Sequence, residues 1–207
     1  MPRVNANKLS IFYSESGSGF PIVFTHGGGG DHSQWDPQMG ELSKKYRVVI
    51  WDRRNCGQTE PKGAPESADL WVADLRALMD ALRNRQAYIG GTSYGGLLTL
   101  EFIYRYPKMA KGGIIVSATG EGYTPSGEYR VAFPSRMADL PNIKVPCLVV
   151  QGKNDTYFPP AVGEALARGL ANAKLALIDA GHGVNQEKPK EFNKAVLDFL
   201  ARVDARA

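Results

Sequence analysis

Short apolar runs alternate with longer amphipathic stretches along most of the chain. The apolar runs are rich in valine, isoleucine, leucine and aromatic residues, as β-strands are. They predict strands at 9–14, 21–26, 47–52, 86–91, 112–117, 146–152 and 173–179, with a weaker one near 3–5. Helical spacing of apolar residues predicts helices at 34–45, 68–84, 94–106, 160–171 and 187–203. This alternation indicates one α/β domain, residues 1–207, with helices on both faces of a mainly parallel sheet.

Two stretches depart from the alternation. The runs 9–14 and 21–26 are joined by the turn sequence ESGSG, which predicts an antiparallel start to the sheet. The segment 119–142 has turn residues and aromatic side chains but no long periodic pattern, so we expect an irregular excursion there. Its aromatic side chains are expected to form an apolar lip or to pack against the sheet edge; they are Tyr123, Tyr129 and Phe133.

The stretch GGTSYGG at 90–96 lies where a predicted strand meets a predicted helix. Glycine costs about 0.5–1 kcal/mol relative to alanine inside either element, so these glycines indicate a backbone requirement. A G-x-S-x-G pattern alone is weak evidence, but at this junction it predicts a sharp strand-to-helix turn. Such a turn exposes Ser93 Oγ at the carboxyl edge of the sheet, where ligands bind in α/β folds.

A serine hydroxyl needs a base to act as a nucleophile. Turns of this kind accompany the chain order serine, acid, histidine, and among three histidines only His182 follows Ser93. The preferred acid is Asp155, which follows the penultimate predicted strand and would orient the imidazole. Two alternatives stay open, namely Glu121 and Asp179.

The sequence HGGGG at 26–30 directly follows another predicted strand. A glycine loop brings backbone N–H groups close to a ligand, so we expect an oxyanion hole from the N–H groups of Gly28 and Tyr94. The surrounding cleft is expected to contain the substrate-binding residues Trp35, Phe158 and Val184. The loop lacks the phosphate-binding patterns, and no cluster has metal-ligand spacing, so neither cofactor nor metal is expected.

The formal net charge is +4, but the basic residues are scattered in short groups, as on a solvated surface. Cys56 and Cys147 form no CxxC pair, which suggests neither a disulfide framework nor a zinc site and fits a reducing compartment. The stretch MPRVNANKLS lacks the apolar run of a signal peptide, and no segment approaches a membrane span. We expect a cytoplasmic protein without nucleic-acid or membrane partners; its oligomeric state is left open.

Five motifs together resemble the α/β-hydrolase family over nearly the whole chain. They are HGGGG with Trp35 (26–35), WDRRNCGQT (51–59), GGTSYGG (90–96), PCLVVQGKND (146–155) and GHGVNQEKP (181–189). The resemblance implies an α/β-hydrolase fold with a mostly parallel eight-stranded sheet. It also implies Ser93 as nucleophile, His182 as base and Asp155 as acid, with Gly28 and Tyr94 as the oxyanion hole. In the second motif it implies that Asp52 and an arginine brace the loop behind the oxyanion hole.

The chain departs from this family in the segment 119–142. Relatives usually insert several helices there as a cap, whereas this chain has only about two dozen residues, so we expect a reduced cap and a shallow, solvent-open cleft. The expected function is a serine hydrolase that cleaves small carboxylic esters or lactones through an acyl-enzyme intermediate. The alternatives are a C–C bond hydrolase or acyltransferase with the same triad, and a receptor of the same fold without turnover.

Overall fold

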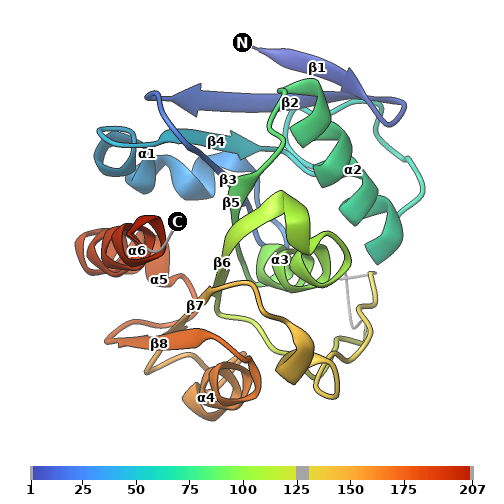
Figure 1. Cartoon of the computed structure of the whole chain (residues 1–207). Helices are drawn as coiled ribbons and strands as arrows, with labels where there is room; N and C mark the ends of the chain where they lie inside the picture. The colour runs from blue at the N-terminus through green and yellow to red at the C-terminus, as the bar shows by residue number, and fades with distance from the viewer. Residues whose placement is uncertain (1, 125–130, 206–207) are drawn as a thin grey trace.

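The computed structural model describes residues 2–124 and 131–205, in which eight strands form one sheet (Figure 1). The strand order is β1-β2-β4-β3-β5-β6-β7-β8. The strands are β1 (Arg3–Ala6), β2 (Leu9–Ser16), β3 (Pro21–Thr25), β4 (Arg47–Trp51), β5 (Ala87–Thr92), β6 (Ala110–Val116), β7 (Cys147–Gly152) and β8 (Ala173–Ile178). The pairs β1/β2 and β2/β4 are antiparallel and the other pairs are parallel. The predicted eight-stranded, mostly parallel sheet is confirmed.

The antiparallel start differs from the expectation in one respect. Strands β2 and β3 run in opposite directions, but β4 lies between them. The connection between β2 and β3 passes across the residues that precede β4, where Gly17 adopts φ +83° and lies against the carbonyl oxygens of Ser43 and Tyr46. A side chain at Gly17 would collide with both oxygens, so the turn signal marks a close crossing of two segments and not a hairpin.

Helices cover both faces of the sheet, as the left and right sides of Figure 1 show. The longer helices are α1 (Asp36–Leu42), α2 (Ala68–Ala81), α3 (Tyr94–Arg105), α4 (Pro160–Gly169) and α6 (Pro189–Asp204). The helix α5 (Val184–Glu187) and three 3₁₀ turns, at His32–Trp35, Pro107–Met109 and Leu140–Asn142, are short. Within the described ranges, no helix combines the length and apolar character that crossing a membrane requires.

Two apolar layers hold these helices to the sheet. One layer packs α2, α3 and α4 on one face, and the other packs α1 and α6 on the opposite face. Strands β5 and β7 are buried along their whole length, which explains their continuous apolar sequences. Each fully buried leucine or phenylalanine in these layers stabilises the fold by about 1.5–3 kcal/mol.

The segment 119–142 contains little regular structure in its described part. Tyr123 and Phe133 form an isolated antiparallel bridge, with N–H to O distances of 2.9 and 3.0 Å in the two directions. Phe133 is buried against Trp71 of α2 and Tyr94 of α3, so it packs on two helices and not on the sheet edge. Tyr129, the third aromatic residue of the expected lip, lies outside the described residues.

A buried ion pair fastens α2 to the chain that follows β4. Arg54 donates to both carboxylate oxygens of Asp74, at 2.6 Å from Nε and 2.7 Å from Nη2. Asn7 Nδ2 donates to the same carboxylate at 2.6 Å, which ties the β1–β2 turn to the pair. Because both charged groups are buried, losing one partner leaves the other uncompensated in a low-dielectric environment.

Replacing this arginine should therefore destabilise the protein strongly. We expect Arg54→Met to lower the free energy of unfolding in urea by about 3–5 kcal/mol, because the Asp74 carboxylate stays buried without its cation. The control is Lys194→Met, which removes an exposed pair with Asp198 on α6 and should change stability by no more than about 0.5 kcal/mol. Equal, small losses in both variants would contradict the assigned role of the buried pair.

Candidate active site

Ser93 lies in a strained turn between β5 and α3. Its backbone has φ 52° and ψ −116°, a conformation that costs a non-glycine residue on the order of 1–3 kcal/mol. Ser93 N–H donates to Val116 O at 2.9 Å, and Ser93 O accepts from Leu97 N–H at 3.0 Å. A side chain at Gly91 would collide with the backbone of Gly95, so the flanking glycines allow the two arms of the turn to touch.

The imidazole of His182 is held by a buried carboxylate. His182 Nδ1 lies 2.8 Å from Asp155 Oδ2, and Asp155 is only 3% exposed. Asp155 Oδ1 also accepts from the backbone N–H groups of Tyr157 and Phe158, at 2.9 and 3.0 Å. Gln151 Nε2 donates to Asp155 Oδ2 at 3.0 Å. Four donors therefore fix this carboxylate, and it in turn fixes the orientation of the imidazole ring.

Neither alternative acid occupies this position. Asp179 accepts a hydrogen bond from Asn154 Nδ2 at 2.9 Å, in an exposed turn after β8. Glu121 follows β6, where its backbone N–H donates to Thr119 Oγ1 at 3.0 Å. The structure thus places Asp155 beside His182, as its predicted position after the penultimate strand had suggested.

The loop that carries His182 is held on both sides. Glu187 accepts from the N–H groups of Gly181 and Gly183, at 2.7 and 3.0 Å. Ser117 Oγ donates to the carbonyl oxygen of His182 at 2.9 Å. These supports were not predicted from the sequence, because Glu187 has the pattern of an ordinary helix residue and Ser117 comes from a distant strand end.

Ser93 and His182 both line one cavity, which has a volume of about 380 Å³. Gly28, Tyr94 and Phe158 also line it, as the sequence predicted. The remaining wall combines the amide side chains of Gln34, Asn185 and Gln186 with the apolar or aromatic side chains of Leu97, Tyr123 and Tyr157. Among the described residues that line the cavity, none is an aspartate, glutamate, lysine or arginine.

Trp35 and Val184 do not line this cavity, contrary to expectation. Both are fully buried in the apolar layer that packs α1 and α6. The Trp35 ring stacks on Phe24 with 4.2 Å between centroids, because the 3₁₀ turn His32–Trp35 directs it into the core. The neighbouring residues Gln34 and Asn185 reach the cavity instead, and hydrophobicity alone could not reveal which neighbour faces inward.

The glycine loop, residues 26–30, is held from behind by polar groups. Gly27 N–H donates to Gln34 Oε1 at 2.8 Å, and Gly27 O accepts from Arg53 Nη2 at 2.8 Å. His26 Nε2 accepts from Arg53 N–H at 3.1 Å, so its Nδ1 carries the proton and donates to Gly27 O at 2.8 Å. Burial lowers the pKa of His26 well below its usual value, and the Arg53 charge lowers the pKa further.

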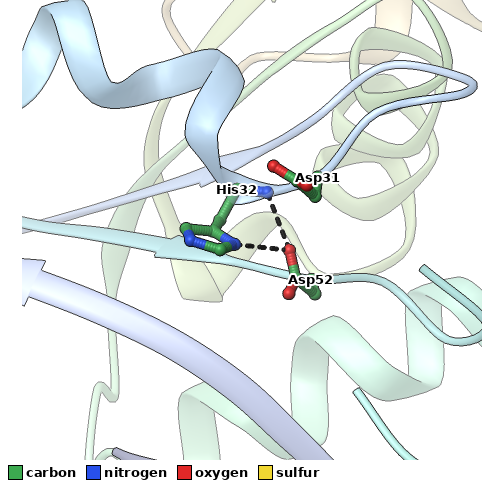
Figure 2. Close-up of side chains that lie close together, drawn as sticks. All are labelled: Asp31, His32 and Asp52. Atoms are coloured by element: carbon green, nitrogen blue, oxygen red, sulfur yellow. Dashed lines mark hydrogen bonds and ion pairs between the residues drawn. The ribbon is translucent and has the colours of Figure 1, made fainter. Parts of the chain in front are cut away.

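Asp31, His32 and Asp52 lie together beside this loop (Figure 2). Asp52 Oδ1 accepts from the backbone N–H and Nδ1 of His32, at 2.7 and 2.9 Å, and Oδ2 accepts from Gln58 N–H at 2.7 Å. Asp31 accepts from Ser33 N–H at 2.9 Å and begins the 3₁₀ turn. Ligand atoms this close could hold a cation, a grouping that sequence spacing did not suggest because Asp52 comes from another strand. The hydrogen bonds of Asp52 to the N–H groups of His32 and Gln58 join the loop after β3 to the loop after β4.

Known proteins share this architecture. A family model described as alpha/beta hydrolase fold matches residues 21–143, more than half of the chain, and one described as TAP-like protein matches residues 129–205. The 2-hydroxymuconate semialdehyde hydrolase of Pseudomonas sp. (strain CF600) is 26% identical, over 93% of this chain and 91% of the relative. That alignment spans 257 positions, 50 more than the 207 residues of this chain, so the relative has residues without a counterpart here.

Two solved structures have the same fold. The enol-lactonase from Burkholderia xenovorans LB400 superposes with a TM-score of 0.89 at 24% identity, covering 97% of this chain and 100% of the other. A thermophilic esterase from Thermogutta terrifontis superposes with a TM-score of 0.89 at 20% identity, covering 98% of each chain.

The buried environment of His26 generates a pH prediction. Because its folded pKa is lowered, His26 should stay neutral at pH 6, whereas an unfolded histidine gains a proton below about pH 6.5. The unfolded chain then binds more protons than the folded one, so this residue lowers stability by up to about 1.4 kcal/mol per pH unit as pH falls below 6.5. Imidazole ¹H–¹⁵N correlation spectra, assigned with His26→Gln, test this directly. A titration midpoint near 6.5 for His26 would refute it.

Proposed function

Because the chain belongs to the α/β-hydrolase family, we propose that it is a serine hydrolase that cleaves small, uncharged carboxylic esters or lactones. The observation that carries the proposal is that Ser93 and His182 line one cavity, with His182 held from behind by Asp155. The absence of charged side chains among the described lining residues favours an uncharged substrate.

In this proposal Ser93 Oγ attacks the substrate carbonyl carbon, and His182 Nε2 accepts the hydroxyl proton. The second nitrogen, Nδ1, faces Asp155 at 2.8 Å, which leaves Nε2 as the nitrogen that exchanges protons with the substrate. Asp155 stays ionised and stabilises the imidazolium that forms.

The carbonyl oxygen gains negative charge in the tetrahedral intermediate and needs donors. We assign these to the N–H groups of Gly28 and Tyr94, whose residues both line the cavity. Tyr94 is the first residue of α3, where the helix dipole favours negative charge. His182 then gives its proton to the leaving alkoxide and the acyl-enzyme forms. It next activates a water molecule, which attacks the acyl carbon and releases the acid and free Ser93.

We propose that the chain forms a single domain in which the segment 119–142 is a reduced cap. The 26% identical relative has residues without a counterpart in this chain, which is compatible with a smaller roof here. The reduced cap supplies Tyr123 to the cavity wall. Phe158 is the predicted substrate contact that lies at the cavity, and Tyr157 beside it is 75% exposed. Substrate groups remote from the scissile bond would therefore meet solvent on one side.

Removing either reacting group should abolish turnover and leave the fold intact. We expect Ser93→Ala to lower kcat for an activated acetate ester by about 10⁴–10⁶-fold, because the nucleophile is lost. His182→Ala should lose a comparable factor, and the double variant little more, since the two side chains act as one unit. The measurement is steady-state hydrolysis at micromolar protein, with folding checked by circular dichroism.

A matched control is Ser16→Ala, which removes an exposed hydroxyl at the end of β2, outside the cavity. It should leave kcat unchanged. Losses that multiply in the double variant would contradict a shared mechanism. A wild-type protein that releases only one equivalent of product, or none, from a panel of esters and lactones would contradict the proposed function.

A further inference from the structure

Arg53 carries a buried charge that the proposed reaction steps do not use. The residue is 2% exposed, and its Nε has no hydrogen-bond partner. The described part of the chain contains no carboxylate within salt-bridge distance of its guanidinium. An unpaired buried guanidinium opposes folding, since desolvation of an ion in the protein interior costs several kcal/mol. Its neighbour Arg54, by contrast, is paired with Asp74.

The contacts of Arg53 converge on the glycine loop. Its guanidinium carbon lies 4.0 Å from the centroid of the Trp71 ring, which supports the cation on its face. Its Nη2 donates to the carbonyl oxygen of Gly27 at 2.8 Å. Among the described residues, the group that accepts a hydrogen bond from the guanidinium at 2.8 Å is thus a backbone carbonyl, while Glu66 and Asp52 act on the charge only through space.

That carbonyl belongs to the same peptide unit as the Gly28 N–H. The Gly27–Gly28 peptide is trans, since Glu60–Pro61 is the cis peptide bond found in the described residues. In a trans peptide the C=O and the N–H point in opposite directions. The oxygen faces Arg53, while Gly28 lies at the cavity. A cation on the oxygen polarises the peptide, which makes the opposite N–H a stronger donor.

Two neighbouring groups complete the arrangement. Gln34 Oε1 accepts the N–H of Gly27 at 2.8 Å, so the Gly27 amide is engaged, whereas Gly28 is one of the residues that line the cavity. His26 Nδ1 gives Gly27 O a second hydrogen bond from a ring that stays neutral. The charge that faces this peptide therefore comes from Arg53; burial lowers the pKa of Arg53 below its usual value, but arginine side chains stay protonated in proteins.

We propose that Arg53 is a positioning residue for oxyanion stabilisation, which acts through the Gly27–Gly28 peptide to orient and polarise the Gly28 N–H. This inference rests on the proposed serine-hydrolase function. A negative charge that develops on the substrate oxygen would meet both the polarised N–H and the field of a buried cation behind it. The ground-state carbonyl, which carries little charge, would gain much less. Loss of this stabilisation should therefore lower kcat and leave KM nearly unchanged.

The test separates turnover from stability. We expect Arg53→Met to lower kcat for an activated ester by about tenfold with KM changed less than twofold, because complete loss of an oxyanion donor costs about 10²–10³ and here the donor is only weakened. Its resistance to urea should be unchanged or higher, since a buried unpaired charge is removed. The inhibition constant of an alkyl boronic acid should rise about tenfold, because the boron becomes a tetrahedral anion when Ser93 Oγ bonds to it.

Two further variants keep the test decisive if Arg53→Met fails to fold. Arg53→Lys retains the charge and should keep most of the turnover, whereas Arg53→Gln retains a donor without charge and should lose as much as Arg53→Met. The matched control is Arg54→Met, assayed where denaturation curves show it folded. It should lose stability but keep its kcat per folded molecule and its boronic acid affinity.

Unchanged kcat and boronic acid affinity in Arg53→Met, with an intact fold, would overturn the inference. A loss of activity that only follows lost stability would also overturn it. An inactive wild-type protein would instead overturn the proposed function itself, so the two failures are distinguishable.

Discussion

Close backbone contact at the β5–α3 turn is the constraint on which the rest of the structure depends. Gly95 lies against the carbonyl oxygens of Thr25 and His26, and Gly96 lies against Ala118. A Cβ atom at either position would force apart the ends of β3, β5 and β6. Because these strands are held together here, Ser93 keeps φ at 52° and faces the same cavity as His182. The parallel sheet then brings distant strand ends to one edge.

A buried anion, a buried cation and a neutral histidine have fixed positions around this edge of the sheet. Asp155 is a buried anion that accepts from four donors. Arg53 is a buried cation with aromatic and carbonyl contacts, and no carboxylate in the described ranges lies within salt-bridge distance of it. His26, the first residue of the glycine loop, contacts Arg53 and is kept neutral by its burial. Asp52 joins the loop at His32 to the loop at Gln58. Buried, preorganised supports of this kind would suit the proposed site, which must stabilise charge without reorganising.

Much of this could be predicted from the sequence, because the signals are local. Apolar runs identify buried strands, and the glycines around Ser93 identify a turn that only small residues permit. The pairing of Asp155 with His182 followed from their positions after neighbouring strands. The side to which a loop residue points is not local, so Trp35 and Val184 were misplaced and Gln34 was missed. Strand neighbours also depend on the whole sheet, which is why β4 between β2 and β3 was not foreseen.

We propose that Ser93 is the activated nucleophile of a hydrolytic site. The most direct measurement is intact-mass spectrometry after treatment with an aryl phosphonate ester, in which a serine oxygen displaces the aryloxide and forms a stable bond to phosphorus. The account predicts one adduct per chain, located at Ser93 by peptide mapping. It also predicts no adduct in Ser93→Ala and labelling slowed by more than about 10³-fold in His182→Ala, since the unassisted hydroxyl is a weak nucleophile. Absence of labelling, or an adduct on another residue, would contradict it.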